Sequence, residues 1–140
     1  MDRQFWISGI LVSVLAFAFG FVVHGVLLAG DYAPLAGSLY RTTEEAQGYL
    51  PYLIIAHLLF GCAFTWIYRQ GKTPGEPWLS QGARFGVAVV ALMTIPMYLI
   101  YYAVQPTPGM LVAKQILFDG VSTVLLGIAA AYLNRSPGEA

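Results

Sequence analysis

Polar side chains occur inside the long apolar stretches of this 140-residue sequence. They include His24, His57 and Asp119, and Gln115 lies one helical turn before the aspartate. A charge at the centre of a membrane helix costs roughly 2.5–3.5 kcal/mol on insertion scales, so residues of this kind are usually paired or functional. Histidine changes its charge near neutral pH, which suits proton-coupled binding of a small ligand or ion. These residues therefore predict a polar site within a membrane.

Aromatic hydroxyls in the third apolar stretch extend this candidate site. Tyr98 and Tyr101 lie three residues apart, so they share one face of a helix. Each tyrosine offers an aromatic ring together with a hydroxyl that can donate and accept hydrogen bonds. The expected ligand-binding residues are His24, His57, Gln115, Asp119, Tyr98 and Tyr101.

Two other functions could use the same residues. His24 and His57 could be the two axial ligands of a b-type haem, or could join Asp119 in a transition-metal site. Alternatively, the polar residues could only specify helix packing in an accessory subunit of a larger membrane complex. The sequence has no HExxH, nucleotide-binding glycine loop or Gly-x-Ser-x-Gly motif. We therefore favour binding or transport of a small ligand or ion over an enzyme activity.

The composition narrows the class of protein. Hydrophobic residues make up 58% of the chain and charged residues only 10%, with a formal net charge of zero. A soluble domain averages roughly a quarter charged residues, and a neutral chain lacks the basic surface that nucleic acid requires. These values exclude an ordinary soluble enzyme, a disordered chain and a nucleic-acid-binding protein. They are typical of an integral protein of the lipid bilayer.

Four apolar stretches are each near the length of about 20 residues that a helix needs to cross the hydrocarbon core. We expect helices over residues 5–29, 50–68, 85–104 and 110–133. The first stretch is too long for the apolar region of a signal peptide, which spans about 7–15 residues. The predicted fold is an all-α, polytopic four-helix bundle that forms one transmembrane domain over residues 1–140.

Helical geometry places the polar residues at similar depths. With a rise of 1.5 Å per residue, His24, His57 and Gln115 lie about 8–10 Å from the outer ends of their helices, and Asp119 lies about 14 Å in. Small and polar residues share a face of each helix with these side chains, and such faces turn toward other helices in membranes. We therefore expect a polar pocket that opens at the outer end of the bundle.

The basic residues predict the orientation. The amino terminus, the second loop and the carboxy terminus hold five of the seven bases, which are Arg3, Arg69, Lys72, Arg84 and Arg135. Cytoplasmic segments are enriched in Lys and Arg, so both termini are predicted to be cytoplasmic in a multi-pass protein of the inner (plasma) membrane. Four helices are few for a complete transport path, so transport would require a homodimer or a larger membrane complex.

Several local patterns carry further expectations. Lys114 lies near the outer end of the fourth stretch, where its side chain can extend to the interface. Pro96 is expected to kink the third helix and to free a carbonyl near Leu92. Gly82-x-x-x-Gly86 is a candidate for close helix packing. The segment from Thr42 to Glu45 matches a capping box, which predicts a short helix in the first loop.

The second and fourth stretches contain a faint internal repeat. A shift of 58 residues aligns four identical residues, Leu53, Leu59, Phe60 and Thr65, with Leu111, Leu117, Phe118 and Thr123. In this register, Gly61 aligns with Asp119. An even number of spans preserves orientation, so such a repeat would give two parallel two-helix halves.

The overall layout resembles small bacterial four-helix integral membrane proteins of uncharacterised function. The segments that carry this resemblance are Trp78, Gln81-Gly82-Ala83-Arg84-Phe85-Gly86, Tyr101-Tyr102-Ala103-Val104-Gln105-Pro106 and Lys114-Gln115. The resemblance covers the architecture of the whole chain, implies four membrane helices and carries over no catalytic residue.

Overall fold

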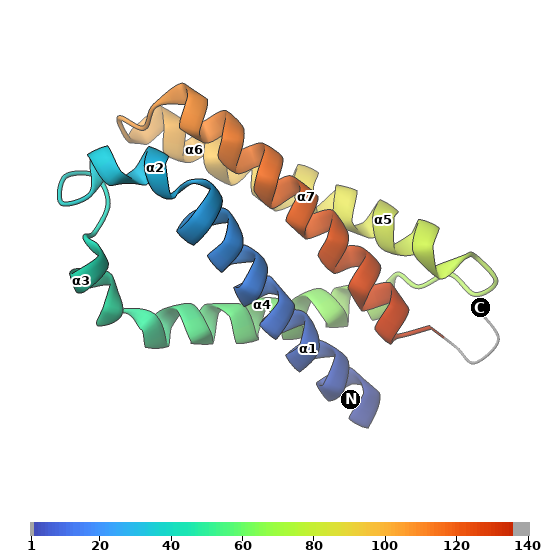
Figure 1. Ribbon diagram of the computed structural model, residues 1–140. Helices are drawn as coiled ribbons and strands as arrows, with labels where there is room; N and C mark the ends of the chain where they lie inside the picture. The colour runs from blue at the N-terminus through green and yellow to red at the C-terminus, as the bar shows by residue number, and fades with distance from the viewer. Residues whose placement is uncertain (1, 136–140) are drawn as a thin grey trace.

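The computed structural model describes residues 2–135, and every named element in this range is a helix (Figure 1). Four helical segments are long and apolar enough to cross a membrane, namely Arg3–Leu27, Leu50–Gln70, Trp78–Val104 and Gly109–Leu133. This confirms the predicted all-helical fold with four long apolar helices. The four segments suggest a multi-pass membrane protein.

The first segment changes its helical form before it ends. Helix α1 (Arg3–Gly20) continues into a π-helical stretch, η1 (Phe21–Leu27), and after Leu28 the chain forms the short helix α2 (Ala29–Tyr32). The Asp2 side chain caps α1 by accepting a hydrogen bond of 2.8 Å from the backbone N–H of Phe5. The first long helix was predicted to end at residue 29. In the structure its continuous helical segment ends at Leu27, and the chain then turns into α2.

The first loop contains the predicted short helix. A 3₁₀ turn, η2 (Ala33–Leu35), leads to helix α3 (Thr43–Gln47), which begins with a complete capping box between Thr42 and Glu45. The hydrogen bonds from Thr42 hold the pKa of the Glu45 carboxyl below its ordinary value. Helix α4 (Leu50–Gln70) follows with Pro51 in its first turn, where the missing N–H of proline costs no intrahelical hydrogen bond.

The third segment begins at Trp78, seven residues before the predicted start. The polar residues around Gln81 give the first turns of this helix the composition of a loop. In the structure, however, Gln81 is only 3% exposed. Its side chain accepts a 2.8 Å hydrogen bond from the Thr73 N–H and donates one of 2.8 Å to the Glu76 carbonyl. Gln81 thus ties the preceding loop to the first turn of α5 (Trp78–Val89).

A second π-helical stretch precedes Pro96. It is η3 (Val90–Thr94), which lies between α5 and α6 (Ile95–Val104). Proline lacks the N–H that an α-helix would direct to the carbonyl four residues earlier, and a wider turn is one way for a membrane helix to adjust to that loss. The expected effect of Pro96 therefore takes the form of a local change in helix type.

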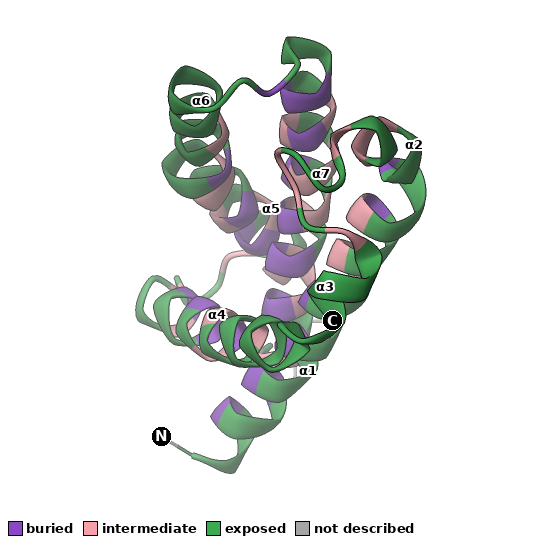
Figure 2. Cartoon of the chain, turned by 90° about the vertical axis from the view of Figure 1, so that its left-hand side faces the viewer, coloured by how far each residue is buried: buried purple, intermediate pink, exposed green. Residues whose placement is uncertain are grey.

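The helices pack as two pairs. Helices α1 and α4 pack closely together, α5 packs against α7 (Gly109–Leu133), and α1 joins the pairs through α7. In Figure 2 the buried residues follow α7 along much of its length, so α7 is the central helix of the bundle. Its buried residues include Leu111, Gln115, Thr123, Leu126 and Ala130.

Glycine permits the close approach in both pairs. A Cβ at Gly61 of α4 would lie 2.2 Å from Ser13 Oγ, and one at Gly127 of α7 would lie 2.4 Å from the Gly82 carbonyl oxygen. Gly86 also packs against α7, so the predicted glycine pair does form a packing face. Gly61 and Gly127 thus make comparable close contacts, each on the second helix of its pair.

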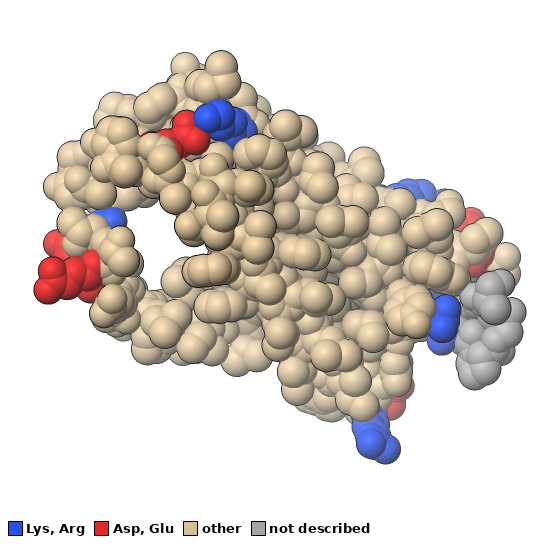
Figure 3. All heavy atoms as spheres, in the orientation of Figure 1, with Lys and Arg blue, Asp and Glu red and all other residues tan. Residues whose placement is uncertain are grey.

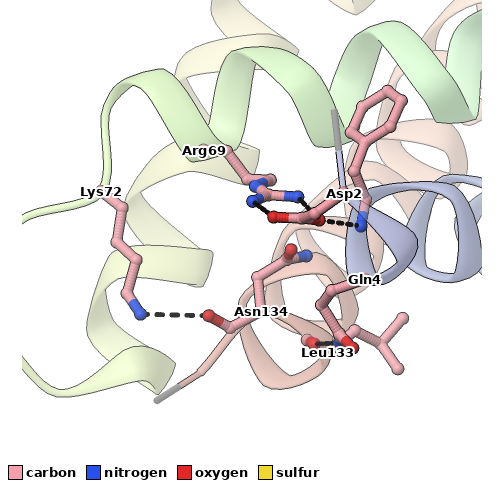
Figure 4. Close-up of polar contacts among 7 residues, drawn as sticks. Asp2, Gln4, Arg69, Lys72, Leu133 and Asn134 are labelled. Atoms are coloured by element: carbon pink, nitrogen blue, oxygen red, sulfur yellow. Dashed lines mark hydrogen bonds and ion pairs between the residues drawn. The ribbon is translucent and has the colours of Figure 1, made fainter.

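The start of α1, the end of α7 and the α4–α5 loop lie at one end of the molecule, here called the terminal end, while α2 and α3 lie at the other (Figure 1). At the terminal end Arg69 forms two hydrogen bonds with the Asp2 carboxylate, of 2.8 and 2.6 Å, and Lys72 donates one of 3.0 Å to the Asn134 carbonyl (Figure 4). The Lys and Arg side chains visible in Figure 3 gather mainly at this end.

Candidate functional site

Asp119 of α7 is the centre of a polar cluster at the end opposite the termini. Its Oδ2 accepts a short hydrogen bond from the Tyr98 hydroxyl of α6 and lies 3.3 Å from His24 Nε2 of η1. Two separate segments, α6 and η1, therefore each direct one polar group toward the same oxygen of α7. A carboxylate inside a membrane segment requires partners of this kind.

The cluster continues from His24 through two further residues. The Tyr32 hydroxyl of α2 lies 2.7 Å from His24 Nδ1, and Gln115 Nε2 donates a 2.8 Å hydrogen bond to the same hydroxyl. Tyr32 can then donate its only proton to His24 Nδ1, which leaves the N–H at Nε2 to face Asp119. With this tautomer every donor in the chain from Gln115 to Asp119 has an acceptor.

The π-helical stretches help to place two of these side chains. Gly20 faces α4, since a Cβ there would lie 3.5 Å from His57, whereas His24 faces α7 and Tyr32. A π turn is wider than an α turn, so it rotates the side chains that follow Gly20 away from the α4 face. Tyr98 likewise lies one turn after η3 on the segment that packs against α7.

A cavity of about 340 Å³ adjoins the cluster. Its volume lies in the range of small-molecule pockets, roughly 300–1,000 Å³. The lining residues come from η1, α2, the first loop, α6, the third loop and α7, and they are His24, Tyr32, Leu39, Tyr40, Tyr98, Tyr101, Gln105, Thr107, Val112 and Gln115. The cavity therefore lies between the ends of three long apolar helices, at the end of the molecule that holds α2 and α3, and the adjoining loops.

An ion pair lies beside the cluster. Lys114 Nζ lies 2.7 and 2.9 Å from the two carboxylate oxygens of Asp31, so α7 and α2 are joined by a bidentate contact. The expected extension of Lys114 toward the interface thus ends on a partner within the chain. This contact fixes α2 against α7 next to Tyr32 and Gln115.

Tyr32 keeps its proton in this setting. Burial raises the pKa of its hydroxyl to about 12. The hydroxyl therefore stays a hydrogen-bond donor at physiological pH. The ring of Tyr32 also packs edge-to-face against Tyr40, with 5.0 Å between the ring centroids.

His57 lies outside the cluster. Its Nδ1 is 2.6 Å from the Leu53 carbonyl of its own helix, and its ring packs edge-to-face on Phe17 of α1. Within residues 2–135, no group of three or more His, Cys, Asp or Glu side chains is arranged to hold a metal ion. The metal site proposed from His24, His57 and Asp119 is therefore not assembled among these residues.

Five of the six residues singled out from the sequence line the cavity or belong to the adjoining cluster. His24, Gln115, Asp119 and Tyr98 are joined by hydrogen bonds or close polar contacts, and Tyr101 lines the cavity. Tyr32, Tyr40 and Thr107 line the same cavity but lie outside the four long helices predicted from the sequence, where helical spacing gives no guide. The acid Asp31 next to Tyr32 is the one signal that could have pointed there, as a partner for Lys114.

Comparisons of the chain with family models, with curated proteins and with solved structures found no match. The functional reading therefore rests on the geometry of the cavity and its polar cluster.

Proposed function

We propose that the chain is a multi-pass protein of the inner membrane, with both termini in the cytoplasm, that binds a small ligand in the cavity at its outer end. The orientation rests on the bases at the terminal end and on the positive-inside rule. Both transport and sensing begin with binding of the ligand, so the proposed function is ligand binding.

One observation carries the proposal. A cavity of about 340 Å³ is lined by His24, Tyr98 and Gln115, which also belong to the hydrogen-bonded cluster around Asp119. An apolar pocket with a few convergent polar groups is the usual form of a small-molecule site. If the polar groups only specified helix packing, they would not need to border a space of this size.

The geometry does not support the hypothesis that His24 and His57 are the two axial ligands of a haem. Of the two histidines, His24 is engaged by Tyr32 and Asp119, and His57 by its own helix and Phe17. A bis-histidine haem needs both imidazole rings to face one space. Small-ligand binding is thus the function that the site supports best.

A ligand screen on the protein in lipid nanodiscs tests the proposal. Neutral, cationic and anionic small molecules are added and the thermal midpoint is measured, because a ligand at 100 times its Kd stabilises a protein by about 2.7 kcal/mol. Val112→Phe places a larger side chain at a buried residue that lines the cavity. We expect at least one ligand to raise the midpoint of the wild type and not that of Val112→Phe.

The matched control is Val121→Phe, which changes a residue of the same helix that is 53% exposed and does not line the cavity. It should respond to the ligand as the wild type does, and both variants should keep a midpoint near the wild-type value without ligand. A screen in which no class of molecule shifts the wild type, or in which Val112→Phe responds fully, would overturn the proposal.

A further inference from the structure

We infer that the ligand of the outer cavity is a small organic ammonium ion; this inference rests on the proposed function and names its substrate class. The first support is the sign of the nearby charge. Asp119 lies behind His24 and Tyr98, and the cavity lining holds no Lys or Arg within the described part of the chain. A carboxylate without a cationic partner at the cavity favours a positively charged ligand.

The neighbouring bases are already paired. Lys114 is held by both oxygens of Asp31, and the Arg41 guanidinium lies 3.8 Å from the centroid of the Tyr49 ring. Asp119, in contrast, has only the Tyr98 hydroxyl and the His24 ring as partners within the described residues. Among the described residues, no Lys or Arg side chain is therefore paired with Asp119.

The hydrogen-bond directions point to the same class of ligand. Tyr98 donates its only proton to Asp119, and Tyr32 donates its own to His24 when the chain of donors is complete. Tyr32 and Tyr98 both line the cavity, and in this arrangement neither hydroxyl has a further proton to donate. What they offer a ligand is lone pairs, which attract an ammonium group and repel an anion.

The aromatic walls add a third support. Four tyrosines line the cavity, namely Tyr32, Tyr40, Tyr98 and Tyr101. The faces of aromatic rings attract organic cations, and several rings around one space recognise ammonium groups. A neutral apolar ligand would be served equally well by Leu or Phe, which makes the choice of tyrosine informative.

A buried threonine hydroxyl without a hydrogen-bond partner among the described residues lies in the third loop, beside the cavity. Thr107 lines it, is only 6% exposed, and its hydroxyl has no hydrogen-bond partner among residues 2–135. Buried hydroxyls are normally paired. A polar substituent on the ligand, such as the hydroxyl of an amino alcohol, would complete this site.

Choline and 3,3-dimethylbutan-1-ol provide a direct test, because they have nearly the same shape and differ in charge. Their affinities are measured by calorimetry on the protein in nanodiscs of neutral lipid. We expect the wild type to bind choline at least tenfold more tightly than the neutral alcohol. In Asp119→Asn, which keeps an acceptor oxygen for Tyr98 and His24, this ratio should fall below threefold.

Adjacent tyrosines supply the matched controls. Tyr101 lines the cavity and Tyr102 does not, so Tyr101→Ala should weaken choline binding at least fivefold and Tyr102→Ala should leave it unchanged. If Asp119→Asn unfolds, Tyr98→Phe replaces it, since this variant removes the lone pairs but keeps the ring; its choline affinity should then fall at least threefold.

The two proposals fail in different ways. Equal or tighter binding of the neutral alcohol, lost in Val112→Phe, overturns the cation inference and supports small-ligand binding. No binding of either probe also overturns the cation inference, and the fate of the proposed function is then decided by the broader screen. An unchanged charge preference in Asp119→Asn excludes the carboxylate as its source.

Discussion

The two ends of the bundle are built by different means from the same four helices. Around the terminal half, backbones approach closely because glycines remove the side chains between them, as at Gly61 and Gly127. Around the other half, α1 and α5 give way to π-helical stretches, and the segments meet through His24, Tyr98 and Asp119. Close backbone contact at glycines distinguishes the first half, and a polar cluster beside the larger cavity distinguishes the second.

One small protein can thus combine a closely packed half with a half that borders a larger cavity. Small residues give membrane helices their closest packing, whereas polar side chains hold helices at a distance that leaves room for a ligand. The terminal half has a smaller hollow of about 180 Å³, lined in part by Tyr68, Gln81 and Arg84. The larger cavity belongs to the half without the close glycine contacts.

The largest effect is expected from filling the α1–α4 contact. Gly61→Val places a branched side chain where even a Cβ would lie 2.5 Å from the Ser13 backbone nitrogen. Overpacking of this kind costs about 3 kcal/mol or more, because the backbone must move. Unfolding by sodium dodecyl sulfate in mixed micelles measures the change.

Gly30→Ala is the control for that experiment, because a Cβ at Gly30 of α2 meets nothing within 4 Å. It should leave the stability unchanged or raise it by up to about 1 kcal/mol, since alanine favours a helix over glycine. Similar losses in both glycine variants would show that close packing is not what distinguishes the terminal half.

A middle-sized effect should separate the two histidines. His24→Leu removes the contacts of the imidazole with the Tyr32 hydroxyl and the Asp119 carboxylate, which is expected to cost about 2 kcal/mol. His57→Leu removes only a contact with its own helix and a ring contact, so it should change the stability by less than about 0.5 kcal/mol. The same micelle titration compares them, and equal losses would refute the cluster as the link between segments.

The smallest effect concerns the charge of Asp2 at the terminal end. The Arg69 guanidinium, followed by the Phe5 N–H, holds the pKa of the Asp2 carboxyl well below its ordinary value of 3.8. Because the folded pKa is depressed, the stabilisation is present above about pH 4 and is lost as the pH falls further. Asp2→Asn keeps an oxygen that can cap α1 and removes the charge.

Stability measured from pH 7 down to pH 3 tests this pairing. The wild type should be the more stable at pH 7, and the difference between the two proteins should shrink as the pH drops below 4. A difference that is constant across this range would mean that the Asp2–Arg69 pair does not contribute through its charge.

Much of the fold was predictable from the sequence because helices of this kind are recognised by their length and high mean hydropathy. The end of the third helix at Val104 follows the apolar pattern, whereas its start does not. Gln81 and Arg84 give the first turns of α5 a polar character, and only the contact of Gly82 with α7 shows why this segment is helical and packed.

The candidate site was predictable in part. Depth along the helix placed His24 and Asp119 at the same end, but depth alone placed His57 there as well. The direction of each side chain depends on the π turn after Gly20, which an ideal helical wheel does not contain. Tyr32 and Thr107 depend on how the loops fold back, which residue spacing does not reveal.

The crossing of α1 and α4 at Gly61 also has a mechanical meaning. Beyond it, α4 extends about 16 Å to Leu50, and its outer residues Tyr52, Leu53, Ile54 and Ile55 are largely exposed. A lever of that length converts a rotation of about 10° at the fulcrum into a displacement of about 3 Å at its tip. Because the tip continues through α3 into the loop that carries Tyr40, a small tilt of one helix would alter the width of the cavity entrance.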